Sequence, residues 1–182
     1  MKSKFAGLFS AAVFLIAAAT FSPVSADTGD DNFGFNEYLI GKSKSEFKFR
    51  GCANGVEGRK DFEICAPPKV ETTIAKLPAQ IQTIVFKNGK LIGIEIDLKT
   101  DEAGMSAVNA SVTEKFGNPF AANPSDAAHH ATLVRWLMGE NQVNSETYSD
   151  GISAVIFFNN VQMKEFYDAQ REAQLNKQNA KK

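Results

Sequence analysis

The sequence has few of the residues that most often perform catalysis or hold metals. It contains 2 His and 2 Cys among 182 residues. The two histidines are the neighbours His129 and His130. Neighbours on an extended segment point to opposite faces, so the pair makes a poor joint metal site, and Asp126 is the nearest candidate for a further ligand. We therefore expect neither a bound metal nor a cofactor.

Short motifs with a known chemistry are missing as well. The chain contains no Gly-x-Ser-x-Gly elbow, no phosphate loop, no dinucleotide fingerprint and no His-Glu-x-x-His helix. A small hydrolase with His129 or His130 as its general base is the enzymatic alternative. Because no neighbouring pattern supports that role, a protein without catalytic activity is the main expectation.

An excess of charge of one sign is also lacking, since 20 basic side chains face 21 acidic ones. Without the two lysines of residues 1–26, the counts become 18 and 21, a net charge of about −3. Binding to nucleic acid depends on a positive surface that neutralises phosphates. This balance predicts a chain that does not bind nucleic acid.

Long hydrophobic runs are limited to the beginning of the chain. Residues 5–21 carry no charge, follow Lys2 and Lys4, and lead into the small residues that end at Ala26. This pattern predicts a signal peptide over residues 1–26 with cleavage after Ala26. An uncleaved anchor is the alternative, although about 17 apolar residues lie at the lower limit for a membrane span. No Cys that could be lipidated lies just after the cleavage point, so we expect a periplasmic or secreted protein without a stable membrane anchor.

The remaining 156 residues fit one domain with a core of its own. Residues 27–32 are polar and acidic, which predicts a flexible lead-in. We place a single α+β domain at residues 33–176 and a frayed basic tail at residues 177–182. Phe33 and Phe35, near the start of this domain, are the expected exposed aromatic patch.

The two cysteines, Cys52 and Cys65, are expected to form a disulfide because an exported chain meets oxidising conditions. The loop between them is polar and has little apolar surface to order it. In the chain-entropy model such a crosslink contributes about 3 kcal/mol. A metal site or a catalytic thiol is the alternative, but no Cys-x-x-Cys spacing or adjacent His accompanies either cysteine.

Local patterns predict an antiparallel sheet with helices packed on one of its faces. Asn88-Gly89 between two β-rich runs is the strongest signal and predicts a hairpin over residues 81–98. A capping-box pattern predicts a short helix at residues 44–49, and spacings of three and four predict helices up to Phe116 and over residues 161–178. Further strands are expected at residues 62–65, 70–77, 132–138, 142–148 and 152–158, of which the last three form a meander. This segregation of helices from an antiparallel sheet is typical of α+β folds.

Two groups of residues are candidates for binding. One is the charged part of the Cys52–Cys65 loop, namely Glu57, Arg59, Lys60 and Asp61. The other is Arg135 with Trp136, because Arg and Trp are favoured anchors at interfaces, although core packing is the more ordinary role of a single Trp. Glu95 and Asp97 share one face of a strand, and we interpret them as a solvated strand face.

The segments 39–47 and 112–119, followed by Trp136, give the chain a family resemblance. It resembles small envelope proteins of the β-lactamase-inhibitor-like and outer-membrane-assembly-lipoprotein type, which pair a helix ending in Gly-x-Pro with a short antiparallel sheet. The chain departs from the lipoprotein members because it lacks a lipidation Cys. The resemblance implies a module that binds another protein through its sheet face or loops, and it assigns no functional residue.

The expected function is therefore that of an exported soluble binding module. It would act as an inhibitor or envelope accessory protein that contacts another envelope or extracellular protein. The small hydrolase is one alternative. A carrier of small ligands is another, and a sizeable apolar pocket between a helix and the sheet would distinguish it.

Overall fold

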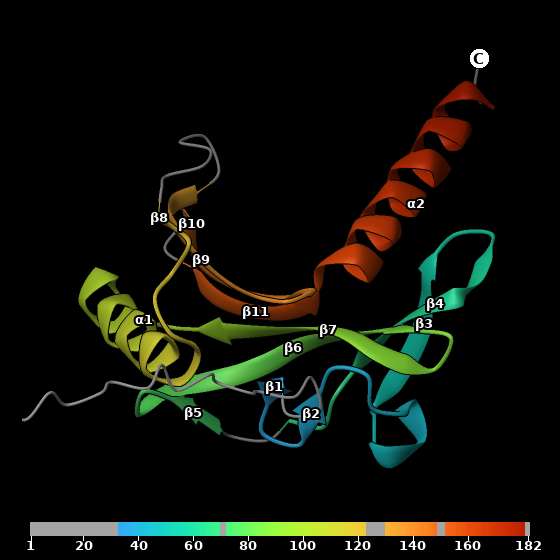
Figure 1. The fold of residues 1–182 in the computed structure, drawn as a ribbon. Coiled ribbons are helices and arrows are strands. Elements are labelled where there is room, and N and C mark those ends of the chain that lie inside the picture. The colour runs from blue at the N-terminus through green and yellow to red at the C-terminus, as the bar shows by residue number, and fades with distance from the viewer. Residues whose placement is uncertain (1–32, 70–71, 123–129, 149–151, 181–182) are drawn as a thin grey trace, which may run out of the picture.

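The computed structural model describes residues 33–69, 72–122, 130–148 and 152–180. These residues form an α+β fold with one nine-stranded antiparallel sheet, a two-stranded ribbon and two α-helices (Figure 1). The elements, in chain order, are β1 (Gly34–Phe35), β2 (Tyr38–Leu39), β3 (Gly51–Val56), β4 (Arg59–Ala66), β5 (Thr72–Ile74), β6 (Leu77–Lys87), β7 (Lys90–Leu98), α1 (Glu102–Phe116), β8 (Ala121–Ala122), β9 (His130–Met138), β10 (Asn141–Tyr148), β11 (Ser153–Asn159) and α2 (Asn160–Asn179). The predicted signal peptide and lead-in lie outside the described residues. Neither of the described helices is long and apolar enough to cross a membrane.

The main sheet joins two antiparallel meanders. Its strand order is β3-β4-β6-β7-β11-β10-β9-β8, with β5 paired to β6. The junction is the pairing of β7 with β11, which brings the hairpin of the first half beside the last strand of the second half. The predicted hairpin and three-stranded meander are both present, but as parts of this one continuous sheet.

Local signals in the sequence fix several element ends. Asn88 and Gly89 have φ angles of 49° and 73° and connect β6 to β7, as the favoured two-residue hairpin turn requires. The side chain of Asp101 accepts a hydrogen bond from the Gly104 N–H at 2.9 Å and caps α1. Asn159 does the same for α2, accepting from the Gln162 N–H at 3.1 Å. The last helix continues to Asn179, past the predicted domain boundary at residue 176.

The predicted first helix is wrong and is replaced by a single 3-10 turn at Lys44–Glu46. The Glu46 carboxylate accepts from the Ser43 N–H at 2.8 Å, so the predicted capping box forms without an α-helix to follow it. Phe47 is extended instead and stacks on Tyr38 with ring centroids 5.0 Å apart. Tertiary packing of this ring outweighs the small helical tendency of so short a segment.

The prediction that the helices share one face of the sheet is also wrong. Met105, Val108 and Val112 of α1 belong to one buried cluster, and Met163, Phe166 and Ala169 of α2 belong to another. On β6, Ile84 and Phe86 pack in the first cluster, whereas Val85 between them packs in the second. Since successive strand residues point to opposite faces, α1 and α2 cover opposite faces. The sheet needs both helices because its first half is apolar on both sides.

The disulfide between Cys52 and Cys65 is confirmed, but the segment that it encloses is not the loosely held polar loop expected from its composition. It is the β3–β4 hairpin, in which the two cysteines are direct cross-strand partners with Cα atoms 4.1 Å apart. Val56 and Phe62 are 3% and 0% exposed and pack against α2. These two apolar residues, which lie among charged residues in the sequence, therefore anchor the hairpin to α2.

Gly55 marks the closest approach of this hairpin to α2. A Cβ at this position would lie 2.8 Å from Cε2 of Phe166 and 3.1 Å from Cγ1 of Ile64. We expect Gly55→Ala to cost about 1–3 kcal/mol because a rigid ring must move to make room. Gly51→Ala is the matched control, since a Cβ there meets nothing within 4 Å. Urea unfolding of both variants checks this, and equal losses of stability would show that the packing is looser than described.

The aromatic residues at the start of the domain are not the exposed patch that was predicted, because Phe33 is buried and Phe35 is half-buried. Phe33 is 6% exposed. Its ring lies 5.6 Å from that of Phe116 and 5.9 Å from that of Phe157. The β1–β2 ribbon thereby covers the same face of the sheet as α1, and α2 is the described element that covers the opposite face.

Candidate functional site

A cleft of about 570 Å³ lies between α2 and the sheet face that α2 covers. Figure 1 shows β10 and β11 curving up from the level of β6 and β7, with α2 rising beyond the other end of β11. The lining residues come from six elements and combine an apolar floor with polar groups: Ile64, Thr83, Val85, Gly93, Ile94, Glu95, Asn144, Glu146, Tyr148, Ile156, Phe158, Met163, Phe166, Tyr167 and Gln170. A volume of this size is typical of sites for small molecules.

The strand register explains why polar side chains meet in this cleft. Glu95 lies opposite Thr83 on one side and opposite Ile156 on the other, and Ile156 lies opposite Asn144. Directly opposite residues of an antiparallel pair project to the same face. Thr83, Glu95, Ile156 and Asn144 therefore form one row across β6, β7, β11 and β10. In the next row, Ala154 of β11 lies opposite Glu146 of β10 on one side and opposite Asp97 of β7 on the other. Asp97 follows Glu95 on the same face of β7.

Hydrogen bonds connect the polar residues of β10 along the strand. Gln142 Nε2 donates to Asn144 Oδ1 at 2.5 Å, and Asn144 Nδ2 donates to Glu146 Oε1 at 3.0 Å. The Tyr148 hydroxyl donates to the other oxygen of Glu146 at 2.6 Å. Donors on both oxygens hold this carboxylate in a fixed orientation, which is the preorganisation that a recognition group needs.

The electrostatic environment of the cleft is acidic. Burial raises the pKa of Glu95, and the charges of Asp97 and Glu146 raise it further, against the opposing effect of a hydrogen bond to Thr83. Burial also raises the pKa of Tyr148, together with its hydrogen bond to Glu146. Burial, followed by the charges of Glu95 and Glu146, raises the pKa of Tyr167. Each of these shifts has a carboxylate among its causes, so the cleft disfavours additional negative charge.

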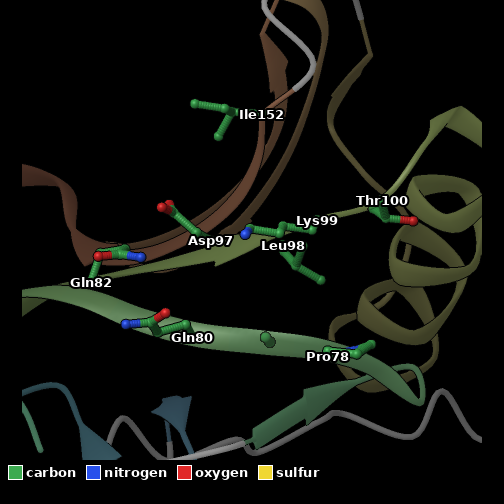
Figure 2. A pocket seen from close by; sticks show the side chains of 9 residues that line it. Pro78, Gln80, Gln82, Asp97, Leu98, Lys99, Thr100 and Ile152 are labelled. Carbon is green, nitrogen blue, oxygen red and sulfur yellow. The ribbon is translucent and has the colours of Figure 1, made fainter. Parts of the chain in front are cut away.

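A second cavity of about 510 Å³ adjoins the cleft along β7 (Figure 2). It is lined by Pro78, Ala79, Gln80, Gln82, Asp97, Leu98, Lys99, Thr100 and Ile152. Figure 2 shows Asp97 and Gln82 side by side at one end of it. Burial raises the pKa of Asp97, while a hydrogen bond from Gln82 opposes that rise. Because Glu95 and Asp97 are successive residues on one face, the acidic surface runs from the cleft into this cavity.

The raised pKa of Glu95 leads to a prediction about stability. The folded protein holds the proton of Glu95 more tightly than the unfolded chain does. The contribution of Glu95 to stability is therefore lost as the pH rises. The loss begins in the pH range where an ordinary glutamate titrates and is complete above the raised pKa of Glu95. Gln is neutral throughout, so we expect Glu95→Gln to be more stable than the wild type at neutral pH and about equal to it below roughly pH 3.5.

Urea unfolding at the two pH values measures this difference. Glu114→Gln is the matched control, because Glu114 is exposed on α1 and makes the same change of charge. A wild-type protein that is more stable than Glu95→Gln at neutral pH would contradict the description of the cleft.

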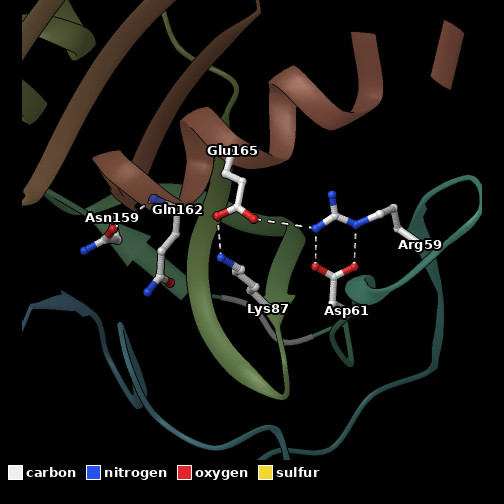
Figure 3. Close-up of polar contacts among 6 residues, drawn as sticks. All are labelled: Arg59, Asp61, Lys87, Asn159, Gln162 and Glu165. Carbon is white, nitrogen blue, oxygen red and sulfur yellow. Dashed lines mark hydrogen bonds and ion pairs between the residues drawn. The ribbon is translucent and has the colours of Figure 1, made fainter. Parts of the chain in front are cut away.

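Two of the charged residues predicted to bind a partner, Arg59 and Asp61, lie in an ion-pair network between the hairpin and α2 (Figure 3). Arg59 donates two hydrogen bonds to Asp61, at 2.8 and 2.5 Å, and lies 3.5 Å from Glu165 of α2. Glu165 also pairs with Lys87 of β6. Hydrogen bonds from Arg59 and Lys87 lower the pKa of Asp61 and of Glu165, respectively. These charges hold α2 beside the hairpin.

The other residues of that predicted loop divide between an ion pair and the surface. Glu57 forms a separate ion pair with Lys177 near the end of α2. Lys60 is exposed on β4. Glu57, Arg59 and Asp61 are thus engaged in ion pairs, and those of Glu57 and Arg59 connect the hairpin to the helix that forms one wall of the cleft.

The predicted pair Arg135 and Trp136 points to opposite faces of β9. Trp136 is 1% exposed, and its Nε1 donates to Thr113 Oγ1 of α1 at 3.3 Å, which is the core role weighed for it. Arg135 is half-buried and lies opposite Asn144, on the face of the cleft. His129 lies outside the described residues, and for His130 the structure describes only a place in β9. Within the described part of the chain, no three metal-ligating side chains come together.

Sequence reasoning missed most of the cleft. It interpreted Glu95 as part of a solvated strand face in preference to an acid/base catalyst, it placed Tyr167 only on the protein-facing side of the last helix, and it gave no role to Glu146 or Tyr148. A signal was present, because Gln142, Asn144, Glu146 and Tyr148 are polar at every second position of one strand. That alternation marks a polar face, but it does not say which strands or helix enclose it.

Comparison with known proteins gives no relative. The chain matches no protein-family model, no curated protein and no solved structure. The geometry of the cleft is therefore the basis for a functional proposal.

Proposed function

We propose that this protein is an exported binding protein that holds a small ligand in the cleft between α2 and the sheet. The observation that carries the proposal is the 570 Å³ cleft, in which an apolar floor meets convergent polar groups. A sizeable pocket between helix and sheet is the feature that favours a ligand carrier over a module with a flat contact face. Function here is argued from the site alone, since the fold does not determine it.

Three properties of the cleft support ligand binding. Its floor contains Ile156, Phe158 and Met163, which offer apolar surface to a hydrocarbon body. The ladder ending at Glu146 fixes a polar contact at one side. The raised pKa of Glu95 shows that this carboxylate is held at a cost in stability, which is common at functional sites.

An oxidising compartment is the proposed location. The disulfide between Cys52 and Cys65 supports it, because such bonds persist mainly in exported proteins. The pattern of residues 1–26 supports the same route. The purified exported protein should begin at Asp27, which mass measurement of the intact chain can check. A mass that includes Met1 would contradict the export route.

Binding of the neutral apolar dye Nile red tests ligand binding. We expect the dye to fluoresce on entering the cleft, and we expect Thr83→Trp to abolish the signal because the indole fills the space beside Glu95. Thr132→Trp is the control, since Thr132 is exposed on β9 and does not line the cleft. Circular dichroism confirms that both variants fold. Equal dye binding by the wild type and Thr83→Trp would overturn the proposal.

Contact with another protein along β3 is a second candidate function. β3 is an edge strand, and Gly51, Cys52, Ala53 and Asn54 are all exposed. It carries neither the charges nor the Pro that usually protect such edges, and an extended partner segment could add to it by main-chain pairing. We expect Asn54→Lys to abolish capture of an envelope partner, and Asn118→Lys, in an exposed loop, to leave it intact. Capture that survives Asn54→Lys would exclude this edge.

A further inference from the structure

The position of the carboxylates in the cleft indicates what kind of ligand it takes. Glu95 of β7 and Glu146 of β10 line the same cavity, and β11 is the one strand between them. The charge of Glu146 acts on Glu95, and so does that of Asp97, in both cases as repulsion. Partial burial strengthens such interactions because water screens them less. A positive group placed between these carboxylates would replace repulsion with attraction.

The walls of the cleft suit an organic cation better than a bare ion. Tyr167 and Phe166 of α2 stand together with ring centroids 5.6 Å apart, and Tyr148 and Phe158 line the same space. Aromatic faces attract ammonium and guanidinium groups. The adjacent side chains of Ile156 and Met163 are apolar, so they do not stabilise a hydrated ion but can contact the aliphatic carbon of an organic ligand.

Other ligand classes fit these walls less well. An anionic ligand would face Glu95 and Glu146 and would be repelled. A transition metal needs three or more closely placed ligands, and the described residues contain no such group. A neutral apolar ligand would use the floor but would leave the half-buried carboxylate of Glu95 without a partner of opposite charge.

We infer that the cleft binds a small organic cation, with an ammonium or amidinium head between Glu95 and Glu146 and an apolar body against Ile156, Phe158 and Met163. This inference rests on the proposed ligand-binding function and adds the chemical class of the ligand. Glu95 supplies the charge, Tyr167 lines the cleft from α2, and the ladder from Gln142 to Tyr148 holds Glu146 in place.

Isothermal titration with three probes of equal chain length tests the inference: decylammonium, 1-decanol and decanoate, each below the concentration at which it forms micelles. We expect decylammonium to bind about tenfold or more tightly than decanol, because a charge-assisted hydrogen bond contributes about 1.5–3 kcal/mol. Decanoate should show the weakest binding of the three. The order decylammonium, decanol, decanoate supports the inference.

Two variants assign the selectivity to the cleft. Glu95→Gln should weaken decylammonium binding by about tenfold or more and should change decanol binding much less. Glu114→Gln, on the opposite face, should change neither. If decanol binds as tightly as decylammonium, and Glu95→Gln affects neither, the cation inference is overturned while ligand binding stands. If none of the probes binds, both the inference and the proposed function are overturned.

Discussion

Replacing Phe166 by Ala is expected to destabilise the protein by about 3–5 kcal/mol. The Phe166 ring is 3% exposed and meets Phe62 edge to face with centroids 5.4 Å apart. It also lies against Gly55 and forms part of the cleft wall, so its loss leaves a cavity between α2 and the β3–β4 hairpin. Equilibrium unfolding in urea measures the stability, and titration with Nile red shows whether the cleft survives.

Tyr167→Ala is the matched control because it removes the next aromatic ring on the same helix. Tyr167 is 54% exposed, so we expect its removal to cost under about 1.5 kcal/mol. Ligand binding should weaken in both variants, since both side chains line the cleft. If Phe166→Ala were no more destabilising than Tyr167→Ala, α2 would not be docked as described.

Removing the disulfide is expected to cost about 3 kcal/mol. The bond joins residues 13 apart in sequence, and its main effect in the chain-entropy model is to restrict the unfolded chain. The double variant Cys52→Ala, Cys65→Ala is preferable to serines because Cys65 is 1% exposed, and a hydroxyl there would be buried. Urea unfolding of this variant, compared with the wild type before and after reduction, measures the contribution.

Thiol titration provides the control for the disulfide. The native protein should show no reactive thiol before reduction and two after it, and reduction should not change the stability of the double variant. An unfolding midpoint of the wild type that does not move on reduction would contradict the structural role of this bond.

Short-range signals predicted most of the longer elements, but not β1, β2, β3 or β8, because turns and caps depend on neighbouring residues. Asn88-Gly89 predicts its hairpin through the positive φ angles that this turn requires. Asp101 similarly marks the start of α1 through the cap that it forms. The segment after Ser43 shows the limit of such signals, since the stacking of Phe47 on Tyr38 decides its conformation and comes from outside the segment.

The candidate site depends on long-range pairing, which the sequence alone does not give. Glu95 and Glu146 share a cleft only because β7 pairs with β11, and no local sequence pattern in either strand predicts this pairing. Val56 stands among polar and charged residues, so composition predicts a polar loop before the strand at residues 62–65 and gives no sign of the contact with α2. Without that contact, α2 has no fixed position, and the face of Glu95 is expected to be open to solvent.

The position of a bound probe is the most direct test of ligand binding in the cleft. With decylammonium bound, nuclear Overhauser effects should connect its alkyl chain to the methyl groups of Ile156 and Met163, which line the cleft. The methyl groups of Met105 and Val108, in the core under α1, should show none. Contacts to the α1 core, or to neither set of methyl groups at a saturating concentration of probe, would contradict the account.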